Sequence, residues 1–478
     1  MSKSEKWLIV VLFFIWLVRL PFLNEIPIFG DEANHLMLAD QLLSGSVTIK
    51  DFVYGGIFPG LIIALSSLRS VFTNHVNPLF IGRAFSFGCT VATAYWLFKI
   101  AQKLFNEKTA LFSVVAYFLF PITLFHGQLV MLEPLMTLFL VLSLYFCLKL
   151  SADLRELVIA GIFLYLATAT KLLAIVSLPA LLVLPFIIYP KQMVKSLLLM
   201  VAMFLVVFVV LYPLVFQSSS HFLTDYLLVG TETFLVNLKL NLWRNCLWIP
   251  TYYSWLIIFL LSGVFVIGLK EKSLKIFWLF GWTGTVILLE SIVGGRFFYP
   301  RHLFPLSVPL ALLTGIGFWK LWKLKTFPAR IVVTITLVFL GFKAMPYYLN
   351  RPDAKLVAED KHQFYEDWIS GVGLKDLGDD LKFLIQNNKK ARIYIGDEAL
   401  LVWALPNVFG VNSSHLITLN GYFGGPKSDL EKQVTRGVNS YLVLNREPYL
   451  PRDFKARMVR TYPKGPNRSI VLWQLEIR

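Results

Sequence analysis

Residues 27–45 read PIFGDEANHLMLADQLLSG and directly follow the first strongly apolar run of the chain, Trp7 to Phe22. Two adjacent carboxylates, Asp31 and Glu32, open this stretch, and apolar residues then recur along it at helical spacing. The stretch therefore predicts a short amphipathic helix at a membrane edge. Its acids have two interpretations: Asp31 caps the helix while Glu32 complements the helix dipole, or the pair carries chemistry.

The composition of the whole chain is that of a polytopic membrane protein. Of the 478 residues, 56% are hydrophobic and only 15% are charged, which is more apolar surface than a soluble chain of this length buries. The formal net charge is +16, which in a soluble protein would suggest nucleic acid. Here the basic residues lie mainly in short gaps between apolar runs, so we predict membrane lipids and no nucleic acid as partners.

Apolar runs separated by basic turns predict about eleven α-helical spans in the cell membrane, with the amino terminus in the cytoplasm. A polar loop at residues 23–78 and a loop of amphipathic character at residues 217–250 then lie on the outer side. After residue 348 the composition becomes that of a soluble domain. We therefore expect a transmembrane domain over residues 1–348 and a small extracytoplasmic α/β domain over residues 349–478.

The predicted α/β domain alternates helical and strand patterns. Helices are expected at Leu374–Ile385, Glu398–Leu405 and Ser428–Arg436. Strands are expected within residues 391–396, 415–419, 440–445, 456–462 and 470–477.

Charged residues gather near the outer ends of the predicted spans, where burial in lipid is costly. Fixed cations suit a phosphate group, and carboxylates suit a general base or a metal ion. For any single cation, snorkelling toward lipid headgroups is the simpler interpretation, but convergence on one side of the membrane favours a site. The candidates are Asp31, Glu32, Arg83, His126, Glu133, Lys171, Arg296 and Arg301.

An ordered set of short motifs resembles the C-type membrane glycosyltransferases, in particular their protein mannosyltransferase and aminoarabinose transferase branch. GDE at residues 30–32 is similar to the Asp-Glu motif of that branch. MLEPLMTLF around Glu133, LATATKLLA around Lys171 and YPRHLFPL around Arg301 resemble its acidic-Pro, Thr-Lys and Arg-aromatic motifs. Glu133 stands where many members have Asp, and His302 replaces the usual Tyr. The resemblance covers nearly the whole chain.

The resemblance implies an integral membrane glycosyltransferase that moves a hexose or pentose from a polyprenyl-phosphate donor, with inversion, to an acceptor on the outer face. The acceptor would be a lipid, a protein or a cell-envelope glycan. Asp31 would be the general base, and Glu32 would orient it or the acceptor. The donor phosphate would be bound by Lys171, Arg301, Arg83 and Arg296.

Glu133 and His126 are left as candidates for binding the acceptor or a metal. The resemblance implies no required cofactor, because the mannosyltransferases of this branch work without a metal. A divalent metal at Glu133, or at Glu32 with His126, stays open.

Two other functional classes compete with this interpretation. A transporter or flippase of a lipid-linked anionic substrate would use the cations as its substrate site. That class predicts paired interrupted helices and internal repeats, and the sequence shows no clear repeat. A membrane-anchored binding protein would not need so many spans.

Overall fold

The computed structural model divides the chain into two compact units. Unit 1 contains Met1–Leu23, Ser44–Ala64 and Arg83–Val357, and unit 2 contains Asn24–Leu43, Leu65–Gly82 and Ala358–Arg478. Packing thus groups part of the first predicted outer loop with the C-terminal residues. The residues that the structure describes are 3–47, 64–68, 71, 77–149, 154–188, 194, 198, 201, 205, 231–293, 298–324, 326–351, 354–367, 369–396, 398–419, 438–445, 455–465 and 468–476.

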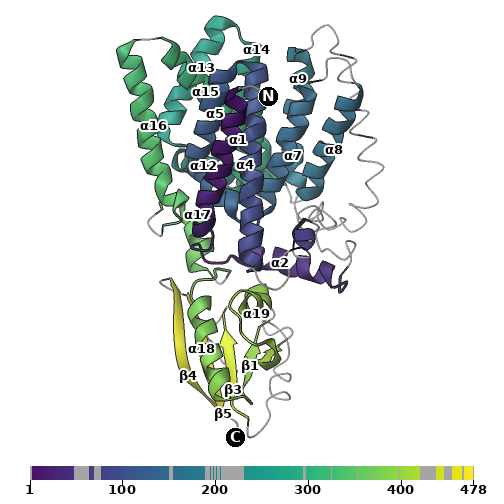
Figure 1. Cartoon of the computed structure of the whole chain (residues 1–478), viewed down its shortest axis with the longest axis vertical. Coiled ribbons are helices and arrows are strands. Elements are labelled where there is room, and N and C mark those ends of the chain that lie inside the picture. The colour runs from purple at the N-terminus through teal and green to yellow at the C-terminus, as the bar shows by residue number, and fades with distance from the viewer. Residues whose placement is uncertain are drawn as a thin grey trace. The chain divides into compact units, whose positions relative to one another are not determined.

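Unit 1 is built from helices that run side by side (Figure 1). Among the described residues, four helices are long and apolar enough to cross a membrane, or up to six if each bent pair is one span. The chain is therefore a multi-pass membrane protein, and the number of about eleven spans stays a prediction. The longer helices are α1 (Lys3–Arg19), α4 (Pro78–Leu104), α5 (Glu107–Leu119), α7 (Leu132–Cys147), α8 (Leu154–Thr170), α9 (Leu178–Ile188), α12 (Thr231–Tyr253), α13 (Trp255–Glu271), α14 (Leu274–Val293), α15 (Ser307–Lys323) and α16 (Phe327–Tyr348).

Short helical segments interrupt or join these helices. Pro121 begins α6 (Pro121–Phe125) directly after α5, and the axis bends there by 69° because proline cannot continue the preceding hydrogen-bond ladder. Ser254, with φ 74°, separates α12 from α13 at a bend of 99°. The other short segments are the 3₁₀ turns η1 (Leu20–Phe22), η3 (His126–Gln128), η4 (Leu172–Ser177) and η7 (Pro300–Leu306).

The second predicted outer loop, residues 217–250, contains regular structure. Its described part is helical, since α12 runs for 23 residues from Thr231. The amphipathic pattern of this stretch is therefore that of a helix.

Unit 2 contains a five-stranded mixed sheet in the order β2-β1-β3-β5-β4. Strand β1 pairs parallel with β2 and β3, while β5 pairs antiparallel with β3 and β4. Helix α18 (Leu374–Asn387) lies along the sheet in Figure 1. The strands are β1 (Arg392–Ile395), β2 (Leu416–Thr418), β3 (Ser440–Leu444), β4 (Lys455–Gly465) and β5 (Arg468–Glu476).

These elements confirm the predicted helix at Leu374 and all five predicted strands. The predicted helix at Glu398 appears as a π-helical turn, Leu400–Ala404, followed by α19 (Leu405–Asn407). The predicted helix at Ser428–Arg436 lies outside the described residues. Every residue of the central strand β3 is buried, as expected for a strand that is covered on both faces.

Helix α2 (Gly30–Leu43) belongs to this same unit. The amide of Gly30 donates to the carbonyl of Ile369 at 2.8 Å, and the indole of Trp403 donates to Asp40 at 2.8 Å. The rings of Phe29 and Phe364 lie 4.5 Å apart. The short helices α17 (Ala358–Lys361) and a π-helical turn, His362–Glu366, precede α18.

Candidate active site

Three charged side chains from distant parts of unit 1 meet at the start of α7. Lys171 Nζ lies 2.5 Å from Glu133 Oε1, and Arg301 Nε lies 3.9 Å from the same oxygen. Glu133 is 2% exposed, whereas Lys171 and Arg301 keep 17% and 14% of their side chains exposed. We call these three residues the cation–carboxylate cluster. The sequence predicted all three as site residues, and the structure brings them together.

Breaks in the helices place these side chains. Glu133 lies in the first turn of α7, next to Pro134, which is tolerated at a helix start. Lys171 has extended backbone between α8 and the 3₁₀ turn η4, and Arg301 lies in η7 just before α15. Each residue therefore comes from an end of regular structure, where a side chain can turn toward its neighbours instead of toward lipid.

Glu290 is a further ionisable residue of this region that the sequence analysis did not include. It lies in α14, its side chain is fully buried, and neither carboxyl oxygen has a hydrogen-bond partner among the described residues. Lys171 and Glu133 act on it electrostatically. A single acid inside the apolar run LLESIV was the available signal, because an ionisable residue within a span indicates function by default.

Arg83 and His126 each have further contacts in unit 1. Arg83 is fully buried in α4, and its Nη1 donates to the carbonyl of Leu23 at 2.6 Å. His126 is buried in η3, with its ring 5.9 Å from that of Tyr252. Arg296 lies outside the described residues.

The two neighbouring acids of unit 2, Asp31 and Glu32, have different surroundings. Glu32 is fully buried, and its Oε2 accepts from the amide of Phe29 at 3.0 Å, which is the acidic half of a capping box. Asp31 lies in the first turn of α2 and is half-buried. The helix-capping interaction that the sequence assigned to Asp31 is thus made by Glu32.

The donor sets do not favour a metal ion. Among the described residues, no group of three His, Cys, Asp or Glu side chains is placed to hold one. Glu133, the main candidate ligand, already faces two cations, which would repel a third positive charge.

Known proteins share this architecture. No curated protein sequence matches the chain, but residues 60–216 match the dolichyl-phosphate-mannose-protein mannosyltransferase family. The structure of ArnT from Cupriavidus metallidurans bound to undecaprenyl phosphate matches with a TM-score of 0.63 at 14% identity, over 98% of each chain. The fold is that of the C-type membrane glycosyltransferases. The resemblance inferred from the ordered motifs is confirmed.

Other structures of this C-type fold also match. The oligosaccharyltransferase of Archaeoglobus fulgidus in its apo form reaches a TM-score of 0.50 at 12% identity, over 93% of this chain and 70% of its own. The apo structure of ArnT gives 0.60 at 15% identity over 98% of each chain. The match to ArnT extends along the whole chain, so it includes the C-terminal sheet as well as the helices.

Proposed function

We propose that the chain is a glycosyltransferase that moves a sugar from a polyprenyl phosphate to an acceptor on the outer face of the membrane, with inversion at the anomeric carbon. The observation that carries this proposal is the convergence of Lys171 and Arg301 on the buried Glu133. Two fixed cations held at helix breaks inside an apolar bundle form a site for an anion.

The net positive charge of the cluster suits a phosphate that acts as the leaving group of the reaction. Glu133 supplies one negative charge against the two cations, so an incoming phosphate would complete the balance. As the bond between the anomeric carbon and the phosphate oxygen breaks, negative charge grows on the phosphate, and cations already in place stabilise it. In support, ArnT was solved with undecaprenyl phosphate, and the Archaeoglobus oligosaccharyltransferase with dolichol phosphate and an inhibitory peptide.

The other half of the reaction needs a base for the acceptor. We assign this role to Asp31, because its side chain is half-buried and so accessible to an acceptor, whereas Glu32 is fully buried. The acceptor oxygen would bond to the anomeric carbon while its proton passes to the Asp31 carboxylate. Arg83 and Arg296 remain additional proposals for phosphate binding.

The test is a transfer assay on the purified full-length protein in nanodiscs, with a panel of polyprenyl-phosphate sugars. We expect release of polyprenyl phosphate together with transfer of sugar. A flippase would move the donor across a membrane without cleaving it, so intact donor throughout the panel would overturn the proposal.

Donor binding by variants of the same protein tests where the phosphate binds. Lys171→Ala and Arg301→Ala should each weaken donor binding, because a charge-assisted contact contributes about 1.5–3 kcal/mol, or roughly tenfold to over a hundredfold in affinity. Lys239→Ala, an exposed lysine on α12, is the matched control and should bind donor normally. Unchanged affinity in both cluster variants would remove the phosphate assignment.

A further inference from the structure

A pocket lies in unit 1 at the ends of α14 and α15 that are remote from the cation–carboxylate cluster. Its volume is about 580 Å³, and it is lined by residues from the last turn of α13, the first turn of α14 and the last turn of α15. Glu290 lies in the opposite end of α14, and Arg301 precedes the start of α15. This pocket is therefore distinct from the cation–carboxylate cluster.

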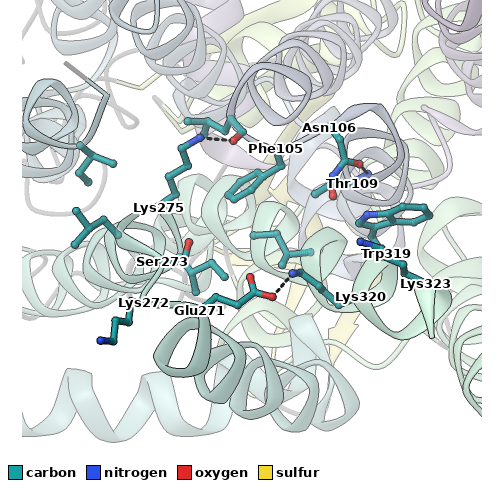
Figure 2. Close-up of a pocket in the computed structure, with 15 residues that line it drawn as sticks. Phe105, Asn106, Thr109, Glu271, Lys272, Ser273, Lys275, Trp319, Lys320 and Lys323 are labelled. Atoms are coloured by element: carbon teal, nitrogen blue, oxygen red, sulfur yellow. Dashed lines mark hydrogen bonds and ion pairs between the residues drawn. The ribbon is translucent and has the colours of Figure 1, made fainter. Parts of the chain in front are cut away.

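The pocket is strongly positive. Four lysines and one glutamate line it (Figure 2). Lys320 is paired with Glu271, and Lys275 Nζ donates to the carbonyl of Leu104 at 2.8 Å. Lys272 and Lys323 are exposed, and they lie on opposite sides of the pocket in Figure 2. Their exposure makes these two lysines accessible to an anion that approaches the protein surface.

Two helices also begin at this pocket. Asn106 caps α5 by accepting from the amide of Thr109 at 2.9 Å, and both residues line the pocket. Ser273 and Leu274, at the start of α14, line it as well. The partial positive charge of both helix starts adds to that of the lysines.

Lysines at this end of the bundle have a simpler explanation, since basic turns mark the cytoplasmic side of most membrane proteins. That rule concerns the number of basic residues in a turn and does not require a cavity between them. Here the cavity has the volume of a small-ligand site. An apolar wall joins the charges, including Ile316, Trp319 and the exposed side chain of Leu274.

We propose that this pocket binds the headgroup of an anionic phospholipid. The lysines on both sides of the pocket attract the anionic headgroup, and Leu274 and Trp319 contact the adjoining glycerol and acyl carbons. The combination of fixed positive charge and an apolar wall favours a lipid over free phosphate. Free phosphate has no apolar part that could contact this wall. On the predicted orientation, the lipid comes from the cytoplasmic leaflet, whose surface is anionic.

The experiment measures lipid retained by the purified full-length protein, using native mass spectrometry during titration with dioleoyl phosphatidylglycerol. Dioleoyl phosphatidylcholine and inorganic phosphate are titrated in parallel. The pocket variant is Lys272→Gln with Lys323→Gln. The matched control is Lys103→Gln with Lys270→Gln, two exposed lysines near the same helix ends that do not line the pocket.

We expect the wild-type protein to bind phosphatidylglycerol in preference to phosphatidylcholine, and the pocket variant to bind it about tenfold or more weakly. The control should stay within about threefold of wild type. If the first variant proves unstable, Lys272→Arg with Lys323→Arg provides a second test. This variant keeps both positive charges and should bind phosphatidylglycerol as the wild type does. Equal weakening in pocket and control variants, or saturable binding of inorganic phosphate without the lipid, would overturn the proposal.

Discussion

At the scale of single residues, Asp31 and Glu32 show how two neighbouring acids acquire different surroundings. Glu32 is buried against the amide of Phe29, whereas Asp31 is half-buried in the same helical turn. We predict that Asp31→Asn abolishes sugar transfer while leaving donor binding near normal, because an amide cannot take the acceptor proton.

A matched control for this exchange is Asp40→Asn. It lies on the same helix, and its amide oxygen can still accept from the indole of Trp403. Single-turnover transfer and donor binding should be measured on both variants. If Asp31 is only a first-turn acid, its loss costs about 0.3–1 kcal/mol of helix stability and transfer continues, which would refute the base assignment.

Glu290 gives a second prediction at this scale, in which stability and activity move in opposite directions. A buried carboxyl group without a hydrogen-bond partner is costly, so Glu290→Gln should leave the melting temperature equal or higher. Transfer should fall, because the side chain lies within the electrostatic reach of Lys171 and Glu133. A variant that keeps full transfer would exclude a functional role for Glu290.

For Glu133→Gln, the expected change in melting temperature has the opposite sign. Removing this carboxylate leaves Lys171 and Arg301 facing each other without it, and breaking a buried ion pair costs about 3–5 kcal/mol. Its melting temperature should therefore fall clearly below that of Glu290→Gln.

Sequence reasoning could identify candidate charges but not their partners. Glu133, Lys171 and Arg301 stand out because each is a charge beside an apolar run. Arg19 meets the same description, yet its guanidinium donates to oxygens of Gln128, Tyr347 and Asn350 and so joins three segments of unit 1. Only the three-dimensional packing distinguishes the charged residues of the cluster from a residue such as Arg19, which joins segments of the fold.

At the scale of elements, the close packing of α15 against α5 predicts a position where unit 1 tolerates little change. A Cβ on Gly315 of α15 would lie 2.7 Å from the amide nitrogen of Ser113 and 2.8 Å from the carbonyl oxygen of Thr109. We predict that Gly315→Ala destabilises unit 1 by about 1–3 kcal/mol, because α5 must move away. Gly341→Ala on α16, where no atom of the described neighbouring residues lies within 4 Å of the added Cβ, should be neutral in the same melting experiment. Equal melting temperatures would contradict this packing.

In unit 2, strand β4 contains a buried lysine that makes stability depend on pH. Burial lowers the pKa of Lys464 from 10.5 to about 7, despite the nearby carboxylates of Glu398 and Asp367. Its ammonium donates to the carbonyl of Ser370. Between pH 7 and 10.5 the unfolded chain binds more protons at this residue than the folded one, so stability rises with pH over that window.

The measurement is the melting temperature of wild type and Lys464→Met at pH 7 and pH 9. The lysine should add up to about 1.4 kcal/mol of stability per pH unit, and the methionine variant should lack this increment. Other titrating groups act on both proteins, so the difference between the two slopes is the relevant quantity. Parallel slopes would show that Lys464 stays charged when folded.

Regular elements were more predictable than their breaks. The strands of unit 2 follow from short β-branched and aromatic runs between turns, but their mixed pairing order is set by contacts between distant segments. Pro121 and Pro300 signal breaks in principle, whereas the left-handed Ser254 carries no such signal. The cluster depends on the helix ends at Glu133, Lys171 and Arg301, so its geometry could not be read from apolar runs alone.

At the scale of the whole molecule, the orientation in the membrane follows from the distribution of charge. Basic turns such as Lys270 to Lys275 predict the cytoplasmic side, which would place Asp31 and the C-terminal domain outside. We predict that a membrane-impermeant thiol reagent labels Ser44→Cys in intact cells and does not label Lys272→Cys. Both positions are exposed in the structure, so protection must come from the membrane.

Labelling of the native cysteines can be minimised in this experiment. Cys89 and Cys147 are buried, and the exposed Cys246 is first replaced by serine. Permeabilised cells should then label both introduced cysteines, which controls for their reactivity. The orientation decides the chemistry, because the proposed acceptor lies outside and the proposed phospholipid lies inside. Labelling of Lys272→Cys with protection of Ser44→Cys in intact cells would therefore reverse the sides of both proposals, while leaving the cation–carboxylate cluster and the basic pocket at opposite ends of α14.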